Sequence, residues 1–322
     1  MHTKLTKIFA IALMSMLVGG IAAAHPRRTI EPIVSTEWLA AHLSDSNLIV
    51  LDVRSAESYG EGHIPGALNE PFEVPFSAWI TMRDDLLLEV PDTEDLFASL
   101  GALGITAQSQ VIVLSDPNPD EPPFYGLSAA TRVADTLIYA GVSNVAVLSG
   151  GYTLWVAESR PVETAAAAPV PAVFDGRVRQ DIFVSSEYTE AHLHRARILD
   201  ARDADVYFGM TVEVYAAKAG HIPTASSFPA PWIWETSDDT VYTVKDVEQL
   251  AQAARGILGT PREGGMHRHF YRDIIVYCGV GGYASALWFV LSEVLKYPMV
   301  RFFDGSAQEW VRDREMRAFR WE

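Results

Sequence analysis

Short apolar runs alternate with longer amphipathic stretches along most of this chain. The short runs predict buried strands at residues 48–51, 111–114, 145–148, 198–199, 274–277 and 300–303. The longer patterns predict helices over residues 126–140 and 284–296, and the second helix should end before Pro298. Strands that alternate with helices indicate an α/β fold, in which helices cover both faces of a mostly parallel sheet.

The same pattern occurs twice along the chain. Residues 48–54 read L-I-V-L-D-V-R and are followed by G-H-I-P at 62–65, while residues 197–202 read R-I-L-D-A-R and are followed by G-H-I-P at 220–223. Two later pairs of segments match in the same order, residues 111–115 with 274–278 and residues 149–155 with 304–310. Ordered self-similarity predicts two copies of one structural unit.

The first residues resemble a targeting segment. Two lysines precede an apolar run over residues 8–18, and three alanines follow at 22–24. This arrangement predicts a signal peptide at residues 1–24, with an uncleaved signal anchor as the alternative. The apolar run is too short to span a bilayer, which needs about 20 residues. We therefore expect a periplasmic or secreted protein that has no membrane association once the signal peptide is cleaved.

The domain boundaries follow from the repeat and from a change in composition. Residues 161–171 are rich in alanine and proline and show no amphipathic period, as is typical of a linker. We predict an N-terminal domain at residues 25–160, a linker at 161–175 and a C-terminal domain at 176–322.

Composition and charge exclude several classes of protein. The 322 residues include 25 Lys and Arg against 41 Asp and Glu, which gives a net charge of −16. A chain this acidic, with no basic tract, is not expected to bind nucleic acid or an anionic membrane. The single cysteine excludes an intrachain disulfide and any metal site built from several cysteines.

That cysteine, Cys278, directly follows a predicted strand and precedes a glycine-rich turn and a helix. The loop that could hold its sulfur comprises Gly279, Val280, Gly281, Gly282, Tyr283 and Ala284. Successive backbone N–H groups in such a turn can point toward a sulfur or a bound anion, and the helix start adds further N–H donors. We expect a reactive thiolate whose pKa lies below the value of about 8.5 for free cysteine. The alternative is a buried, inert thiol.

The paired D-x-R and G-H-I-P segments, the cysteine loop in the second copy only, and a glycine followed five positions later by tryptophan resemble the tandem-domain rhodanese family of sulfurtransferases. The resemblance implies two rhodanese-like domains. It also implies a ping-pong reaction, in which Cys278 takes sulfane sulfur from a small anionic donor, thiosulfate or 3-mercaptopyruvate. The resulting persulfide passes the sulfur to cyanide or a thiol, and neither a metal nor an organic cofactor is implied.

The loops of the two copies differ from each other and from the familiar family patterns. The sequence C-G-V-G-G-Y at 278–283 shares glycines with the C-G-S-G-x-T of mercaptopyruvate-using members and lacks the cations of the C-R-K-G-x-T of thiosulfate-using members. In the first copy Ser115 takes the cysteine position, and residues 116–123 are rich in proline and acidic side chains. Because proline has no N–H donor, the first domain is predicted to be non-catalytic.

Arg202 is the candidate for binding an anionic donor. It follows the predicted strand at 198–199, at the carboxyl edge of the sheet where Cys278 also lies. The matching Arg54 in the copy without a cysteine favours the alternative, an arginine that is tied to an acidic neighbour and stabilises the fold.

Two other functions remain open from the residues. A periplasmic sulfur-relay or persulfide-binding protein without fast turnover would use the same loop. A phosphatase or arsenate reductase on the same fold needs an arginine that clamps oxyanion oxygens, and Ser285 follows the loop instead.

Several conspicuous side chains have structural explanations. His63 recurs as His221 in the second copy, so hydrogen bonding at a turn is favoured over a role as an interdomain acid. Trp232 and Trp234 could line the pocket or simply pack. The two histidines at 267 and 269 have no nearby third ligand, so no metal site is predicted.

Overall fold

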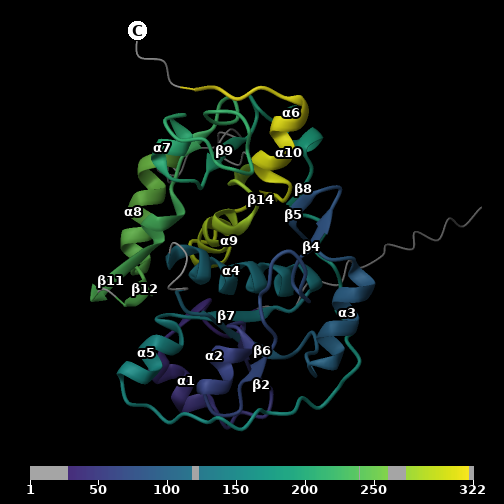
Figure 1. The fold of residues 1–322 in the computed structure, drawn as a ribbon, viewed down its shortest axis with the longest axis vertical. Helices are drawn as coiled ribbons and strands as arrows, with labels where there is room; N and C mark the ends of the chain where they lie inside the picture. The colour runs from purple at the N-terminus through teal and green to yellow at the C-terminus, as the bar shows by residue number, and fades with distance from the viewer. Residues whose placement is uncertain (1–27, 118–122, 239, 260–272, 319–322) are drawn as a thin grey trace, which may run out of the picture.

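A computed structural model describes residues 28–117, 123–238, 240–259 and 273–318. The chain forms two α/β domains, the N-terminal one at the bottom of Figure 1 and the C-terminal one at the top. The signal peptide predicted at residues 1–24 lies outside the described residues. Within the described ranges, no helix has both the length and the apolar character that crossing a membrane requires.

The N-terminal domain is built on a five-stranded sheet in which every neighbouring pair is parallel. In spatial order its strands are β1 (Ile33–Val34), β7 (Asn144–Leu148), β6 (Gln110–Leu114), β2 (Leu48–Asp52) and β3 (Leu68–Asn69). The strands predicted at 48–51, 111–114 and 145–148 are confirmed. They are continuous apolar runs because helices cover both faces of a parallel sheet.

The C-terminal domain repeats this sheet. Its strands, in spatial order, are β10 (Ser226–Ser227), β9 (Arg197–Asp200), β13 (Ile274–Tyr277), β14 (Val300–Phe303) and β8 (Phe183–Val184), and all neighbours are parallel. The order is that of the first sheet read from its opposite edge, with the strand that precedes the cysteine position in the centre of each. The α/β fold predicted from the alternating pattern is therefore confirmed.

The helices of the N-terminal domain are α1 (Thr36–His42), α2 (Ala56–Glu61), α3 (Thr93–Ala102), α4 (Pro123–Ala140) and α5 (Gly151–Ala157), and a hairpin is formed by β4 (Thr81–Arg83) and β5 (Leu86–Glu89). Those of the C-terminal domain are α6 (Ser186–Ala191), α7 (Ala204–Tyr207), the 3₁₀ helix η1 (Ala230–Ile233), α8 (Val247–Leu258), α9 (Gly282–Phe289), the π-helical η2 (Val290–Val294) and α10 (Ser306–Asp313), with a hairpin of β11 (Trp234–Asp238) and β12 (Val241–Val244).

The repeat extends to the helix caps. The hydroxyl of Ser35 accepts a hydrogen bond from the N–H of Trp38 at the start of α1, and the hydroxyl of Ser185 accepts one from Tyr188 at the start of α6. Each cap satisfies a backbone donor that the first turn leaves free. The two copies therefore begin in the same way.

Helices α4 and α9 pack against each other where the domains meet (Figure 1). Every residue of α9 from Tyr283 to Phe289 is buried, and a helix that is apolar on all sides must be covered on all sides. One apolar cluster includes Leu137 of α4 together with Leu287 of α9, so the two domains share a core.

The second predicted helix differs from expectation at both ends. It begins at Gly282, two residues earlier than predicted, and after Phe289 it widens into a π-helix in which the N–H of Leu295 bonds to the carbonyl of Val290. Lys296 then takes a left-handed conformation with φ of 58°, which ends the helix before Pro298.

The hairpin β4–β5 of the first domain docks on the second. The side-chain amide of Gln308 in α10 accepts a hydrogen bond from the N–H of Leu87 and donates one to its carbonyl, at 2.9 and 2.8 Å. A buried ion pair joins the domains beside it, because Arg132 of α4 lies 2.8 Å from Asp304. These contacts place the first domain directly against the start of α10.

Candidate functional site

A cleft of about 670 Å³ opens between the two domains. The N-terminal domain lines it with residues of the segment that joins β2 to α2, of β5 and of the start of α4. The C-terminal domain lines it with residues of the Cys278 loop and of the segment after α7. Parallel sheets place their ligands at the carboxyl ends of the strands, and both sheets direct that edge toward the cleft.

Cys278 lies in this cleft at the end of β13 and is only 3% exposed. Its Sγ accepts a hydrogen bond from the N–H of Gly281 at 3.0 Å, and the N–H groups of Val280 and Ala284 also act on the sulfur. Gly281 has φ of 106°, a left-handed conformation that favours glycine and turns the chain into α9. The loop therefore forms the ring of N–H donors that the sequence predicts.

The ionisation of Cys278 differs from the expectation. Burial raises the pKa of the thiol, the N–H of Ala284 lowers it, the carboxylate of Glu213 raises it, and the N–H groups of Gly281 and Val280 lower it. The pKa is raised overall, so the predicted lowering is wrong for the unliganded protein. The loop donors were visible in the sequence, whereas the burial and the nearby carboxylate come from the tertiary structure.

The opposite side of the loop is fixed by α10 and by the first domain. The N–H of Cys278 donates to the hydroxyl of Ser306, and its carbonyl accepts from Ala307. At Gly281, a Cβ would stand 3.7 Å from a guanidinium nitrogen of Arg132 and 3.8 Å from Leu88, both from the N-terminal domain. The domain without a cysteine thus helps to hold the loop in place.

Arg202 lines the cleft, but its guanidinium is already engaged. Two of its nitrogens donate to Asp200 at 2.9 and 2.6 Å, one also donates to the carbonyl of Gly220, and Nη1 contacts Glu213 at 3.3 Å. Burial opposes the charge of Arg202, but the attraction of Asp200 outweighs it and raises the pKa of the guanidinium. This geometry favours the structural alternative, and donor binding by Arg202 stays a prediction.

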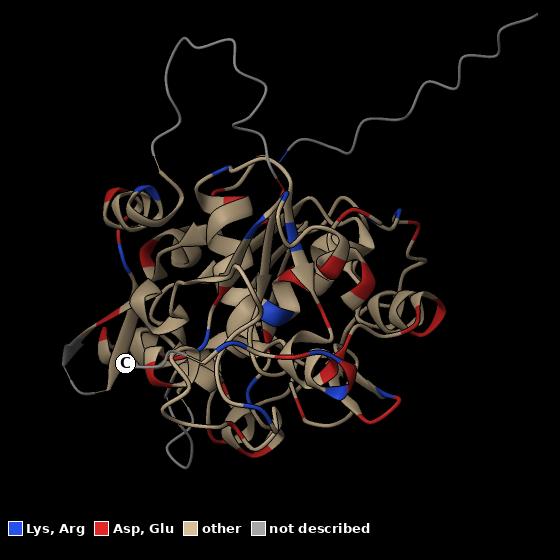
Figure 2. Cartoon of the chain, turned by 90° about the horizontal axis from the view of Figure 1, so that it is seen from above, with Lys and Arg blue, Asp and Glu red and all other residues tan. Residues whose placement is uncertain are grey.

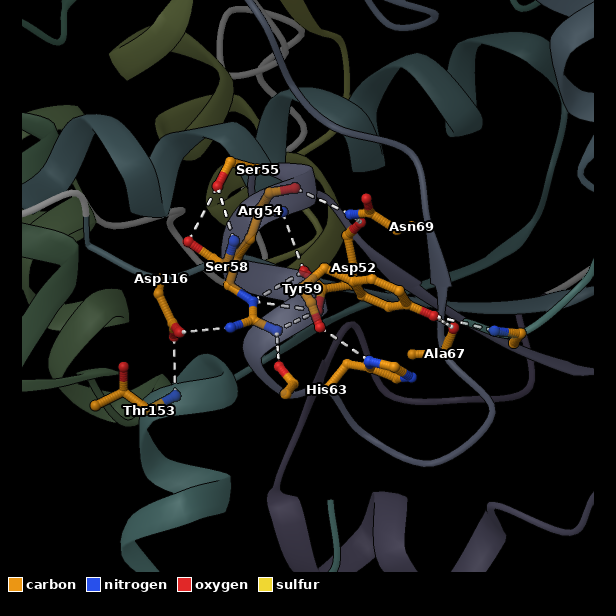
Figure 3. A network of polar contacts seen from close by, with 12 residues as sticks. Asp52, Arg54, Ser55, Ser58, Tyr59, His63, Ala67, Asn69, Asp116 and Thr153 are labelled. Carbon is orange, nitrogen blue, oxygen red and sulfur yellow. Dashed lines mark hydrogen bonds and ion pairs between the residues drawn. The ribbon is translucent and has the colours of Figure 1, made fainter. Parts of the chain in front are cut away.

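Arg54 has the same environment in the first domain (Figure 3). Its guanidinium donates to both oxygens of Asp52 and to the carbonyl of Gly62, and it lies 3.8 Å from Asp116. The repeated D-x-R motif therefore ties the end of β2 in the first domain, and of β9 in the second, to the G-H-I-P turn of the same domain. An arginine that does the same work in both copies is explained by the fold.

Glu213 is the site residue that the sequence analysis missed. It follows α7 in a segment without regular structure, and its side chain is 23% exposed in the cleft. Its carboxylate lies next to the cysteine loop, since a Cβ on Gly279 would stand 2.8 Å from its Oε2. Burial raises the pKa of Glu213, although Arg202 lowers it. Nothing local in the sequence distinguishes this acid from the other 40 acidic residues of the chain.

Three tyrosines complete the wall of the cleft around the cysteine. The rings of Tyr125 and Tyr283 meet edge to face with centroids 5.2 Å apart, the first from α4 and the second from α9. Tyr215 lines the same cleft and is half exposed. Burial raises the pKa of Tyr125 to about 12, with smaller effects from Glu213 and Cys278, so its hydroxyl is protonated at neutral pH.

Other candidates lie elsewhere. His63 is fully buried, stacks on Tyr59 at 3.7 Å and forms a hydrogen bond with its carbonyl, so it does not face the cleft. Trp234 is buried against Phe124, and Trp232 is half exposed outside the cleft. The histidines at 267 and 269 fall outside the described residues. Within the described part of the chain, no group of three or more metal-ligating side chains comes together.

Ser115 replaces the cysteine in the first domain. Its hydroxyl donates to the carbonyl of Gly126 at 2.7 Å, so it is used to hold the start of α4. Asp116 accepts a hydrogen bond from the N–H of Thr153, and burial raises the pKa of its carboxyl group. Residues 118–122 of the corresponding loop lie outside the described residues.

Comparisons with known proteins identify the family of both domains. A family model described as "Rhodanese-like domain" matches residues 35–158 and 185–313. A "Putative thiosulfate sulfurtransferase" of Synechococcus elongatus is 30% identical over 297 residues, covering 90% of this chain and 85% of the relative. The "Sulfur carrier protein TtuD" of Thermus thermophilus is 29% identical over 300 residues, covering 89% of this chain and 94% of the relative.

A solved structure shows the same arrangement of domains. The crystal structure of SseA from Escherichia coli, described as a 3-mercaptopyruvate sulfotransferase, superposes with a TM-score of 0.69 at 26% identity, covering 86% of this chain and 99% of that one. The two matched ranges fall within the predicted domains 25–160 and 176–322 and leave the predicted linker between them. With both domains matched and relatives aligned over most of its length, the chain belongs to the tandem-domain rhodanese family of sulfurtransferases.

Proposed function

We propose that this protein moves sulfane sulfur from a small anionic donor, thiosulfate or 3-mercaptopyruvate, to cyanide or a thiol through a persulfide on Cys278. The observation that carries the proposal is a lone cysteine in the interdomain cleft whose sulfur accepts a backbone N–H hydrogen bond at 3.0 Å. Relatives named as thiosulfate sulfurtransferases support it. A periplasmic or secreted location remains part of the proposal.

In the first half-reaction the Cys278 thiolate attacks the outer sulfur of the donor. The new bond joins Sγ to that sulfur. With thiosulfate the bond between the donor's two sulfurs breaks and its electron pair leaves with sulfite. With 3-mercaptopyruvate the bond between carbon and sulfur breaks and its electron pair leaves with the enolate of pyruvate. The persulfide anion then carries its charge on the outer sulfur. The N–H groups of Val280, Gly281 and Ala284, which act on Sγ in the free protein, supply donors that stabilise the charge of the persulfide.

The raised pKa of Cys278 affects only the unliganded protein. A thiol protonated at neutral pH must lose its proton before it attacks, so the rate of persulfide formation should rise with pH through the thiol pKa. Once the sulfur is bound, the persulfide is more acidic than the thiol and interacts with the same loop donors. The loop thus favours the loaded state.

A sulfur relay without fast turnover is the second candidate. The relative named as a sulfur carrier protein, which aligns over 94% of its own length, favours it. Both functions form the same persulfide and differ in how quickly a small acceptor removes the sulfur. An oxyanion-binding phosphatase finds no support, because Ser285 uses its hydroxyl within the domain interface, 2.8 Å from that of Thr131.

Steady-state assays with each donor and with cyanide as acceptor test the proposal. We expect thiocyanate formation by the wild-type protein and none by Cys278→Ser, because an alkoxide is too basic to form at neutral pH and oxygen holds sulfane sulfur poorly. Turnover that survives the substitution contradicts the proposal. Stoichiometric loading of Cys278 followed by slow release favours the relay.

A further inference from the structure

The two arginines of the cleft are neutralised by buried aspartates. Arg54 lies 2.6 Å from Asp52 and Arg202 lies 2.6 Å from Asp200, and both aspartates are fully buried. Three further carboxylates line the cleft, those of Glu73, Asp116 and Glu213. Among the described lining residues there is no lysine to balance them. Each arginine also contacts one of these three acids, Arg54 with Asp116 and Arg202 with Glu213. Because each arginine is already paired with its buried aspartate, the cleft carries excess negative charge.

The acidity of the cleft follows the overall composition of the chain, but its arginines are held by buried aspartates. Figure 2 shows acidic and basic residues on many of the elements seen from above. In the cleft, by contrast, the arginines are fixed by short hydrogen bonds and cannot turn toward a ligand without abandoning a buried aspartate. Leaving a buried charge unpaired is costly, so these arginines stay where they are.

Glu213 is a carboxylate of the cleft that acts on the reacting sulfur. Its Oε2 lies against Gly279, the residue that follows Cys278. Burial is the main cause of the raised thiol pKa, and the carboxylate of Glu213 adds to it. Because 23% of the side chain is exposed, solvent and salt screen its charge in part. Any substrate that reaches the sulfur passes close to this carboxylate.

The neighbouring aromatic rings suit the same kind of ligand. Burial raises the pKa values of Tyr125 and Tyr283, and Glu213 and Cys278 lie close enough to both to add to the effect. The face of a tyrosine ring attracts an ammonium group, and a carboxylate at the same site strengthens that attraction. Tyr215 adds a third ring to the lining.

We propose that Glu213 is a specificity-determining residue that makes the Cys278 persulfide transfer its sulfur preferentially to a thiol carrying a positively charged amine. The inference rests on the proposed persulfide function and names the class of its acceptor. It also means that thiosulfate and 3-mercaptopyruvate load the cysteine against an opposing charge.

The transfer step is balanced without any added oxidant. The acceptor thiolate forms a bond to the outer sulfur of the persulfide, the bond between that sulfur and Sγ breaks, and its electron pair stays on Cys278 as a thiolate. The acceptor leaves as a persulfide. An amine on the acceptor, two carbons from its sulfur, stays on the side of Glu213 while the thiolate meets the sulfur.

The test uses three acceptors of similar size and different charge. Cysteamine is cationic, 2-mercaptoethanol is neutral and 3-mercaptopropionate is anionic. The full-length protein is loaded with thiosulfate, freed of donor and mixed with each thiol, and the rate at which the persulfide disappears is measured per thiolate. We compare the ratio of the rate with cysteamine to the rate with 3-mercaptopropionate. This ratio should be roughly tenfold larger in wild type than in Glu213→Gln. The intrinsic reactivity of each thiol cancels in this comparison.

Glu248→Gln is the matched control, since it removes one negative charge from an exposed position on α8 that does not line the cleft. It should keep the wild-type order of acceptors. Glu213→Gln should also load faster with thiosulfate. In wild type alone, 0.5 M salt should reduce the preference for cysteamine, which tests the charge effect even if the Glu213 variant does not fold.

The outcomes separate the two proposals. A persulfide that forms but reacts with the same acceptor preference in wild type and Glu213→Gln overturns the role of Glu213 and leaves the proposed function intact. A wild-type preference that does not respond to salt also contradicts it. Failure of the thiosulfate and 3-mercaptopyruvate donors to load Cys278 overturns the proposed function itself.

Discussion

Removing one partner of the ion pair between Arg132 and Asp304 should be one of the most destabilising single changes at the domain interface. Arg132 is fully buried on α4, lies 2.8 Å from Asp304 and donates to the carbonyl of Leu88. The rings of Phe183 and Phe302 lie 5.1 Å from its guanidinium carbon. Replacing the arginine with methionine keeps most of the volume but leaves the carboxylate of Asp304 buried without its cation.

We therefore expect Arg132→Met to lower the free energy of unfolding by about 3–5 kcal/mol, the usual cost of breaking a buried pair on one side. Adding Asp304→Asn should recover part of the loss, because the amide oxygen can still accept the hydrogen bond from the N–H of Val90, 2.8 Å away in the wild type. A coupling energy of at least about 1 kcal/mol is expected.

Urea unfolding at pH 6, followed by tryptophan fluorescence, measures all four proteins of this cycle. The pH is chosen because the nearby Glu89, whose pKa is raised to about 8 by burial and then by Asp304, stays protonated there. Additive effects of the two substitutions, or an Arg132→Met protein within about 1 kcal/mol of wild type, would refute the reasoning.

Three further predictions follow from the site and its surroundings. Arg202→Ala and its matched counterpart Arg54→Ala should each lower the melting temperature by several degrees, because each leaves a buried aspartate unpaired. A tenfold loss of kcat/KM for thiosulfate in Arg202→Ala, with an unchanged melting temperature, would instead assign Arg202 to donor binding. Alkylation of Cys278 by iodoacetamide should have its pH midpoint above the free-thiol value of about 8.5, and a midpoint below it contradicts the effect of burial. Burial, and then Asp304, raises the pKa of Glu89 to about 8 in the folded protein, against an ordinary value of 4.5. The folded protein therefore holds this proton more tightly and loses stability as pH rises between these values, by up to roughly 1.4 kcal/mol per pH unit. The melting temperature of Glu89→Gln relative to wild type should rise from pH 5 to pH 8, and a difference that is constant with pH argues against it.

The sequence predicts the elements that depend on local patterns. The strands are continuous apolar runs because both sheets are covered on both faces, so their positions could be found without tertiary information. The loop after Cys278 is equally local, since its glycines and the start of α9 place the N–H donors. The order of these signals in two copies also indicates the family.

Features that depend on contacts between distant residues could not be predicted. Arg202 was recognised, but its engagement with Glu213 depends on how the segment after α7 folds back toward the sheet. The predicted direction of the Cys278 pKa shift is wrong, because the shift depends on burial and on the carboxylate of Glu213. The ion pair of Arg132 joins α4 to the loop before α10, 172 positions away, and has no local signature.

Mass spectrometry of the protein after incubation with thiosulfate or 3-mercaptopyruvate tests the central claim most directly. We predict a mass increase of one sulfur atom on the peptide that contains Cys278, reversed by a thiol acceptor and absent from Cys278→Ser. A wild-type protein that turns over either donor while Cys278 remains an unmodified thiol throughout would contradict the persulfide account.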